Sequence, residues 1–198
     1  MNFNFEQNLI LENNHVRLRP LQREDIKNLL PIALEDKTLL DLSPSQIHNE
    51  TLLTKYIETA VTGRENKSRF PFIIFDKKNE RYVGSTSFGN ISNKNQRLEI
   101  GWTWISRALH GTGFNMYCKL LLLTYAFEKL EAERVELKTD SRNIASRKAI
   151  LKIGAQYEGA LRSHTVMSDG YRRDTVYFGI LKNEWKGIKV ERFRKYLG

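Results

Sequence analysis

The stretch Arg97-Leu-Glu-Ile-Gly-Trp-Thr-Trp-Ile105, followed by His110-Gly-Thr-Gly-Phe-Asn115, decides the fold of this chain. The first segment is rich in residues that favour strands, and the second precedes an apolar run at 120–127 that is typical of a buried helix. Glycines let the backbone approach a ligand, and the N–H groups at a helix start attract phosphate. This order predicts a phosphate-binding turn, although an isolated Gly-x-Gly is also compatible with a plain turn.

Strict alternation along 97–105 predicts two faces for this strand. One face, which we expect to be core, carries Leu98, Ile100, Trp102 and Trp104. The other, which we expect to be available for chemistry, carries Arg97, Glu99, Gly101 and Thr103.

The segments upstream predict a strand, two helices and two further strands. A strand is expected at 15–19 and a helix after Pro20, with Pro31 as a kink or break, followed by a helix over 49–62 that Gly63 ends. Strands at 70–75 and 82–88 then join 97–105 in an antiparallel meander.

The segments downstream predict a strand, a helix and a hairpin. The strand lies near 135–137, and the helix at 143–153 has an inward face of Ala145, Ala149, Ile150 and Ile153. A hairpin joins 156–167 to 171–181. A basic helix at about 183–197 ends the chain. The pattern is mixed α/β around one central sheet, and we expect a single domain over 1–198.

Composition narrows the function classes. A chain of 198 residues with 40% apolar residues can bury one core, and its single cysteine, Cys118, cannot form an internal disulfide. The four histidines show no metal-ligand spacing, and neither a signal peptide nor a membrane span is evident, so we expect a cytoplasmic protein. The net charge of +9 suits a polyanion, whether nucleic acid or a phosphate-rich cofactor, or a solvated terminal helix.

Further motifs follow the glycine loop: Asn143-Ile-Ala-Ser146, then Lys152-Ile-Gly154 and Glu158-Gly159. In this order and spacing the chain resembles the GNAT superfamily, and more narrowly the branch of the RimJ and RimL ribosomal-protein N-terminal acetyltransferases. The resemblance runs from Val16-Arg-Leu-Arg-Pro20 to Glu184-Trp185. It implies a GNAT fold, in which a twisted, mostly antiparallel mixed sheet is flanked by helices and splayed between its fourth and fifth strands.

The resemblance also implies acetyl-CoA as co-substrate and no metal. The pyrophosphate would be bound by the loop His110, Gly111, Thr112, Gly113, Phe114 and Asn115. Trp104 and Ile105 would lie beside the pantetheine and thioester, Asn143 would hydrogen-bond the pantetheine, and Ser146 would lie near the sulfur. The alternative for Asn143 is simple helix capping. His110 and Asn115 depart from the usual loop pattern, and Ile150 stands where many members have a proton-donating tyrosine.

Amide formation from a thioester needs a deprotonated amine, a polarised carbonyl and a proton for the sulfur. We interpret Glu99 as the base, acting through water, or alternatively as an exposed glutamate paired with Arg97 or a neighbour. A backbone N–H near Trp104 or Ile105, where the strand is expected to bulge, would polarise the carbonyl, and Ser146 is the candidate acid. The remaining candidates are His164 and Asp174, as acceptor-site residues or plain surface residues, and Cys118, as a small core residue.

The resemblance favours a protein N-terminal α-amine as acceptor. A small amine such as a polyamine, aminosugar or antibiotic is the alternative within enzymes. From another class, the basic chain could be a non-catalytic RNA- or ribosome-binding module, although the sequence contains no RNA-recognition motif. Nucleic acid is not required for the enzyme interpretation, no membrane partner is expected, and a homodimer is possible.

Overall fold

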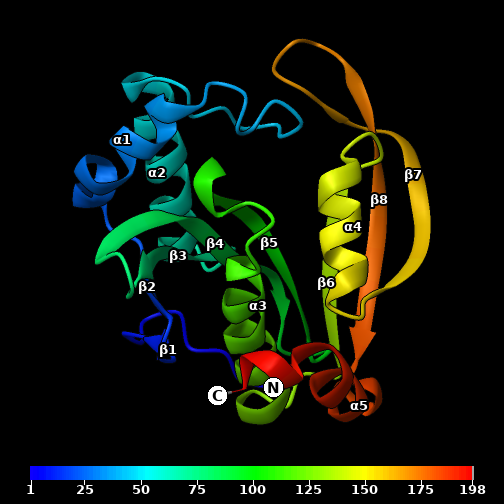
Figure 1. The fold of residues 1–198 in the computed structure, drawn as a ribbon. Helices are drawn as coiled ribbons and strands as arrows, with labels where there is room; N and C mark the ends of the chain where they lie inside the picture. The colour runs from blue at the N-terminus through cyan, green and yellow to red at the C-terminus, as the bar shows by residue number, and fades with distance from the viewer. Residues whose placement is uncertain (198) are drawn as a thin grey trace.

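A computed structural model describes residues 1–197, which form one eight-stranded sheet (Figure 1). The strand order is β1-β2-β3-β4-β5-β6-β8-β7. Neighbouring strands are antiparallel except for β5 and β6, which are parallel. The expected mixed, mostly antiparallel sheet is therefore confirmed.

The N-terminal part supplies two strands and two helices. These are β1 (Leu11–Glu12), β2 (Val16–Pro20), a 3-10 turn (Arg23–Asp25), α1 (Ile26–Glu35) and α2 (Glu50–Glu65). Pro31 lies within α1 and does not end it. The expectation that Gly63 ends the second helix is wrong, because α2 continues past it. Gly63 instead allows close packing, since a Cβ there would lie 3.1 Å from the Cβ of Arg69.

The expected meander is confirmed. It consists of β3 (Arg69–Asp76), β4 (Arg81–Ser92) and β5 (Arg97–Ile105), each antiparallel to the one before it. The chain then crosses over through α3 (Phe114–Thr124) to β6 (Arg134–Asp140), because a parallel neighbour cannot be reached by a tight turn.

The remaining elements complete the second half of the sheet. These are α4 (Ile144–Lys152), β7 (Gln156–Val166), β8 (Arg172–Leu181), α5 (Lys182–Phe193) and a 3-10 turn η4 (Arg194–Tyr196). The predicted hairpin and C-terminal helix are present. Gly170, with a φ of 82°, is in the turn between β7 and β8, where the left-handed conformation favours glycine.

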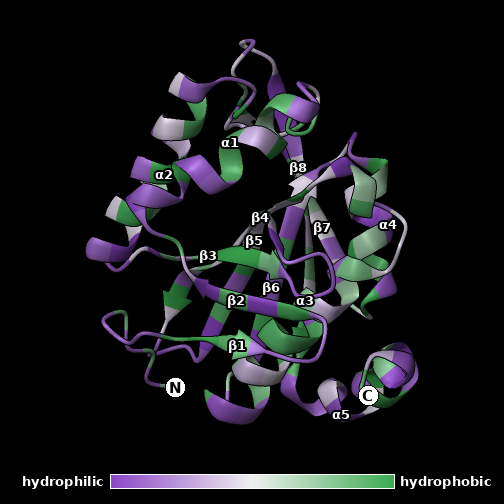
Figure 2. Ribbon diagram, turned by 60° about the vertical axis from the view of Figure 1, so that its left-hand side comes forward, coloured by the Kyte–Doolittle hydropathy of each residue, from purple (hydrophilic) through white to green (hydrophobic). Residues whose placement is uncertain are grey.

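Helices cover both faces of the sheet, each over its own apolar cluster. One cluster joins α3, α4 and α5 to side chains such as Phe72, Leu98 and Ile100, and the other joins α1 and α2 to Ile73 and Trp104. Both helix layers mix hydrophilic and hydrophobic residues, as expected for helices with one face on a sheet (Figure 2). Among the described residues, no helix combines the length and apolar character needed to cross a bilayer.

The inward face predicted for α4 is partly wrong. Ile150 and Ile153 are buried, but Ala145 and Ala149 are exposed. The stripe that faces the sheet instead includes Ser146 and Arg147, which are both partly buried. A search for apolar periodicity misses such a stripe, because half of its members are polar.

The sheet splays between β5 and β6. Their pairing extends only across Arg97–Glu99 and Arg134–Glu136, and the strands separate toward the end where α3 and α4 begin (Figure 1). These are the fourth and fifth strands expected from the sequence, because the short β1 was not anticipated. Within residues 1–197, the splay leaves one edge of β5 without a strand partner from Ile100 onward.

Candidate active site

A bulge interrupts β5 where it leaves β6. Ser85 and Ser87 of β4 pair with Trp104 and Gly101, so Thr86 faces both Trp102 and Thr103. Trp102 has a φ of 50°, which is unusual for a bulky residue and supplies the extra residue of the bulge. The bulge expected near Trp104 and Ile105 is therefore present, but it begins slightly earlier in the strand.

The two faces predicted for 97–105 by strict alternation are wrong, because the bulge changes which side chains share a face. Leu98 and Ile100 belong to the cluster under α3, whereas Trp104 belongs to the cluster under α1 and α2. Thr103 is brought to the α3 side, where its Oγ1 accepts a hydrogen bond from Lys119. The correction follows from the extra residue, because every side chain beyond a one-residue bulge changes face.

The end of β5 presents a backbone donor to the splay. The N–H of Ser106 donates to Val83 O of β4 at 2.7 Å. Since successive residues of a strand present their N–H groups to opposite sides, the N–H of Ile105 points away from β4, toward the edge that β6 has left. The carbonyl of Ile105 lies 3.1 Å from the Nε2 of His110, so the histidine ring ties the strand end to the following loop.

The loop after β5 contains consecutive free amides. The N–H groups of Gly111, Thr112 and Gly113 have no hydrogen-bond acceptor within residues 1–197. Gly111 and Gly113 have φ values of 75° and 90°, and a Cβ on Gly111 would meet nothing within 4 Å. Thr112 Oγ1 accepts from Phe114 N, which closes the first turn of α3. A loop of unbonded N–H groups at a helix start is suited to an anion.

The C-terminal turn supports this loop from behind. A Cβ on Gly113 would lie 2.8 Å from the hydroxyl of Tyr196, and the Tyr196 ring packs edge-on against Tyr117 of α3 at 4.9 Å. Asn115, in the first turn of α3, has its Oδ1 enclosed without a donor among the described residues. Its amide oxygen is therefore turned into the protein.

The N-terminus of α4 lies at the same splayed end of the sheet. Asn143 is its N-cap, and its Oδ1 accepts from Ser146 N at 2.9 Å. The capping alternative for Asn143 is thus correct in itself, but it occupies only Oδ1 and leaves the Nδ2 donor unused within the described part of the chain. Ser146 lies on the partly buried side of α4, and its hydroxyl has no partner within the described residues.

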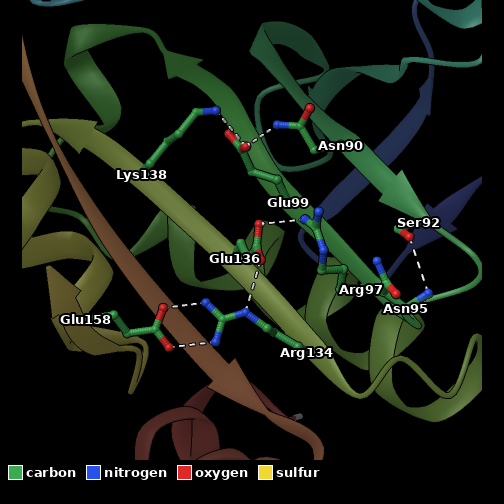
Figure 3. A network of polar contacts seen from close by, with 9 residues as sticks. All are labelled: Asn90, Ser92, Asn95, Arg97, Glu99, Arg134, Glu136, Lys138 and Glu158. Carbon is green, nitrogen blue, oxygen red and sulfur yellow. Dashed lines mark hydrogen bonds and ion pairs between the residues drawn. The ribbon is translucent and has the colours of Figure 1, made fainter. Parts of the chain in front are cut away.

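Glu99 is buried, which contradicts the exposed alternative considered for it. Its Oε2 receives both the ammonium of Lys138 at 2.9 Å and the Nδ2 of Asn90 at 2.7 Å (Figure 3). Its Oε1 has no partner within residues 1–197 and lies over Gly101, whose Cβ would be 2.8 Å away. This oxygen is not among the sealed side-chain atoms that lack a partner, so water can reach it.

Of the pairings considered for Glu99, with Arg97 or with a neighbour, the described residues show the second, with Lys138 and Asn90. Arg97 belongs to a separate ladder of charges. Arg97 bonds Glu136, which bonds Arg134, which in turn holds Glu158 through both carboxylate oxygens (Figure 3). This ladder runs from β5 through β6 to β7, across the seam where the two halves of the sheet meet.

Sequence reasoning missed two side chains that contact β5, one at Glu99 and one at Trp102. A second bulge in β4, at Asn90 with a φ of 47°, allows Asn90 to face Glu99. Arg69 is buried without a carboxylate partner in the described part of the chain, and its guanidinium lies 4.8 Å from the ring of Trp102. Neither contact has a sequence signal, because each depends on the register between strands.

The hairpin candidates hold their own strands together. His164 Nδ1 lies 3.1 Å from Thr175 Oγ1, and Asp174 Oδ1 accepts from Ser163 N at 2.7 Å. The His164 ring also packs edge-on against Tyr177, over which the Lys138 ammonium lies at 5.9 Å. His164 is therefore linked to Glu99 through Tyr177 and Lys138, whereas the Asp174 side chain bonds Ser163 of its own hairpin.

Cys118 is part of the core, as expected, and burial raises the pKa of its thiol to about 12. It therefore stays protonated and a poor nucleophile near neutral pH. Within residues 1–197, no three His, Cys, Asp or Glu side chains come together as a metal site would require.

Comparisons with known proteins agree with this geometry. The family model "Acetyltransferase (GNAT) domain" matches residues 15–156. The "Putative ribosomal N-acetyltransferase YdaF" of Bacillus subtilis (strain 168) is 29% identical, over 89% of this chain and 97% of the relative.

Solved structures share the fold. A "putative acetyltransferase" from T. thermophilus has a TM-score of 0.84 at 31% identity, covering 96% of this chain and 97% of that one. Mycobacterium smegmatis RimJ in complex with CoA-disulfide has a TM-score of 0.75 at 22% identity, covering 91% and 88%. The RimJ-like resemblance read from the sequence is thus matched by relatives of that type. The chain belongs to the GNAT family of N-acetyltransferases.

Proposed function

We propose that this protein transfers an acetyl group directly from acetyl-CoA to an amine, with a protein N-terminal α-amine as the acceptor. The observation that carries the proposal is the run of three amides at 111–113 that are free within the described residues, next to the unpaired edge of β5. A ligand with a diphosphate at one end and an extended chain at the other would use both features, because the diphosphate would bind the amides and the chain would lie along the edge of β5.

The residues present fit coenzyme A, a ligand that GNAT enzymes use as the acetylated thioester. The amides of the 110–115 loop would hold the pyrophosphate, and the edge of β5 near Trp104 and Ile105 would hydrogen-bond the extended pantetheine like an added strand. The free Nδ2 of Asn143 is available to the same chain from the opposite side of the splay. The thioester supplies the activated acyl group.

The chain's own groups meet the three chemical demands of the transfer. Oε1 of Glu99, which has no partner in residues 1–197 and is open to water, would accept the amine proton through a water molecule. The N–H of Ile105, which points into the splay, would donate to the developing oxyanion. The unbonded hydroxyl of Ser146 would donate to the departing sulfur, since Ile150 has no proton to offer.

The choice of acceptor rests on chemistry and on the relative from Bacillus subtilis. An α-amine has a pKa of about 7.7 to 8.0 and a lysine side chain about 10.4, so one carboxylate acting through water suits the α-amine better. The word "ribosomal" in the relative's name points to the same class of acceptor. A small amine is the alternative that the experiment must separate.

The test is release of free thiol from acetyl-CoA with a panel of N-terminal peptides, polyamines and aminosugars. We expect turnover with peptides, and kcat reduced about 100-fold by Glu99→Gln, as is usual for loss of a proton-transfer group. Ser146→Ala should reduce kcat only about tenfold, because water can replace the hydroxyl as proton donor. Glu24→Gln and Ser168→Ala change exposed residues far along the chain from the site and should retain full activity.

Three outcomes would count against parts of this proposal. Faster turnover with polyamines or aminosugars than with peptides would show that the acceptor is a small amine. Full activity of both site variants would remove the roles of Glu99 and Ser146. Calorimetry that detects no binding of coenzyme A would overturn the proposal as a whole.

A further inference from the structure

Lys119 is a buried lysine without an ionic partner among the described residues. It lies on α3 with 6% of its surface exposed, and no carboxylate within residues 1–197 lies within 4 Å of its ammonium nitrogen. The surrounding cluster under α3 is apolar. A charged side chain in such a place is strongly destabilising unless it is paired. Packing alone does not explain a lysine here, because methionine has nearly the same shape without the charge.

The side chain of Lys119 reaches the bulge of β5. Its Nζ donates to Thr103 Oγ1 at 2.8 Å, and this oxygen lies 2.7 Å from Thr86 Oγ1 on β4. These two threonines are the residues that face each other across the bulge. Thr103 Oγ1 also lies 3.4 Å from the carbonyl of Gly101. The ammonium is thus joined to both strands at the point where β5 departs from regular pairing.

Other contacts also act at the bulge, because the hydroxyl of Tyr56 donates to Trp102 O at 3.3 Å and the Arg69 guanidinium lies 4.8 Å from the Trp102 ring, but both hold Trp102 and not Thr103. Trp102 keeps a left-handed φ of 50°, a strained conformation for a residue that has a Cβ. The bulge sets the register of Trp104 and Ile105, and therefore the side of the strand on which the Ile105 N–H lies. A donor aimed at a reacting carbonyl must be held within a fraction of an ångström.

We propose, as an extension of the acetyl transfer proposed above, that Lys119 is a positioning residue for the reaction: acting through Thr103 and Thr86, its ammonium fixes the bulge that aims the end of β5 at the thioester. It does so from the α3 side of the sheet, opposite to Glu99, and does not touch either substrate. The uncompensated charge is retained because it maintains this local backbone conformation.

The protonation state of Lys119 makes the proposal testable. Burial lowers the pKa of Lys119 to about 8, and the neighbouring Cys118 thiol is the one titratable group that adds to its electrostatic environment among the described residues. From the strands packed against it, the Thr103 hydroxyl accepts its hydrogen bond and the Thr86 hydroxyl lies next to that oxygen, while the buried carboxylate of Asp76 on β3 acts on the adjacent Cys118 thiol. Loss of the proton weakens the hydrogen bond to Thr103, so the bulge should loosen as pH rises through about 8.

The first experiment measures the bulge without any substrate. Amide chemical shifts of Trp102 and Thr103 should titrate with a midpoint near pH 8 in the wild type. The titration should vanish in Lys119→Met and persist in Lys129→Met, which removes an exposed lysine from the short π-helix Tyr125–Lys129 that follows α3. Wild-type shifts that do not move as pH rises from neutral to alkaline, or a titration that survives Lys119→Met, would overturn the proposal.

The second experiment measures the reaction. At saturating substrates, kcat of the wild type should fall above pH about 8, while Lys119→Met should have a kcat about tenfold lower at pH 7 and no fall. Thr103→Val should reproduce this loss, and the double variant should be no worse than either single one. A Lys119→Met enzyme with wild-type kcat and pH profile would overturn the proposal. An inactive wild type would contradict acetyl transfer, and the shift titration would still decide the role of Lys119.

Discussion

Gly113 is a position where the backbone conformation and a neighbouring side chain both exclude a Cβ. Its φ is 90°, and a Cβ would lie 2.8 Å from the Tyr196 hydroxyl, whereas Gly111 has a similar φ of 75° and open space. Gly111→Ala should therefore cost about 1 to 2 kcal/mol of unfolding free energy from backbone strain alone. Gly113→Ala should cost about 1 to 3 kcal/mol more from overpacking, measured by urea denaturation. Tyr196→Phe, which removes the clashing oxygen, should narrow the difference, and equal costs for the two glycines would contradict this account.

Lys119 also contributes to the dependence of stability on pH. Its pKa in the folded protein is about 8, below its ordinary value of 10.5, so between these values the unfolded chain holds more protons. Stability contributed by this residue should rise with pH from about 8 to 10.5, and below pH 8 the full cost of the buried charge remains. Lys119→Met should therefore raise the unfolding free energy at pH 7 by about 1 to 3 kcal/mol and remove its rise between pH 8 and 9. Above pH 9 the Cys118 thiol, whose pKa burial raises from 9.0 to about 12, contributes a fall in stability in the wild type and in the variant. A destabilised variant in urea melts at pH 7 would show that the charge is compensated.

At the scale of the element, β5 shows which structural features the sequence predicts and which it does not. Its existence and its length follow from residue type, and the glycine loop and the start of α3 follow from Gly111 and Gly113. The expectation of a bulge near its end comes with the family resemblance and not from residue type. The face of the sheet on which Trp102 and Thr103 lie does not follow from residue type. A one-residue change in the position of a bulge moves every later side chain of the strand to the other face of the sheet. The amino-acid sequence alone does not determine that position.

The same reason explains which parts of the candidate site were found. Glu99, Asn143 and the 110–115 loop lie within recognisable local motifs. The partners of Glu99 come from the bulge at Asn90 and from Lys138 of the parallel strand, and only the register of three strands brings them together. The buried stripe of α4 was missed for a different reason, because Ser146 is polar and an apolar period does not include it.

At the scale of the whole molecule, the protein consists of two sheet halves that share a narrow seam. In the part of the chain that the structure describes, the β1–β5 half and the β6–β8 half are paired only across 97–99 and 134–136, and the charge ladder from Arg97 to Glu158 reinforces the same place. Beyond the seam, the described parts of the two halves have no strand pairing to hold them together. A ligand that contacts β5 and the start of α3 on one side and the start of α4 on the other would bridge them.

Coenzyme A should therefore stabilise the whole fold and not only its loop. At a concentration of about 100 times its Kd, a ligand that binds only the folded state adds about 2.7 kcal/mol, which corresponds to a rise in Tm of about 5 to 10 °C for a chain of this size. Pantetheine, which lacks the pyrophosphate, should give a much smaller rise at the same concentration, because it cannot use the amides of 111–113. Hydrogen exchange should slow on both sides of the splay, in 100–105 and in 143–146. An equal shift with pantetheine would show that the loop does not bind the diphosphate, and protection confined to one half would show that the ligand does not bridge the seam.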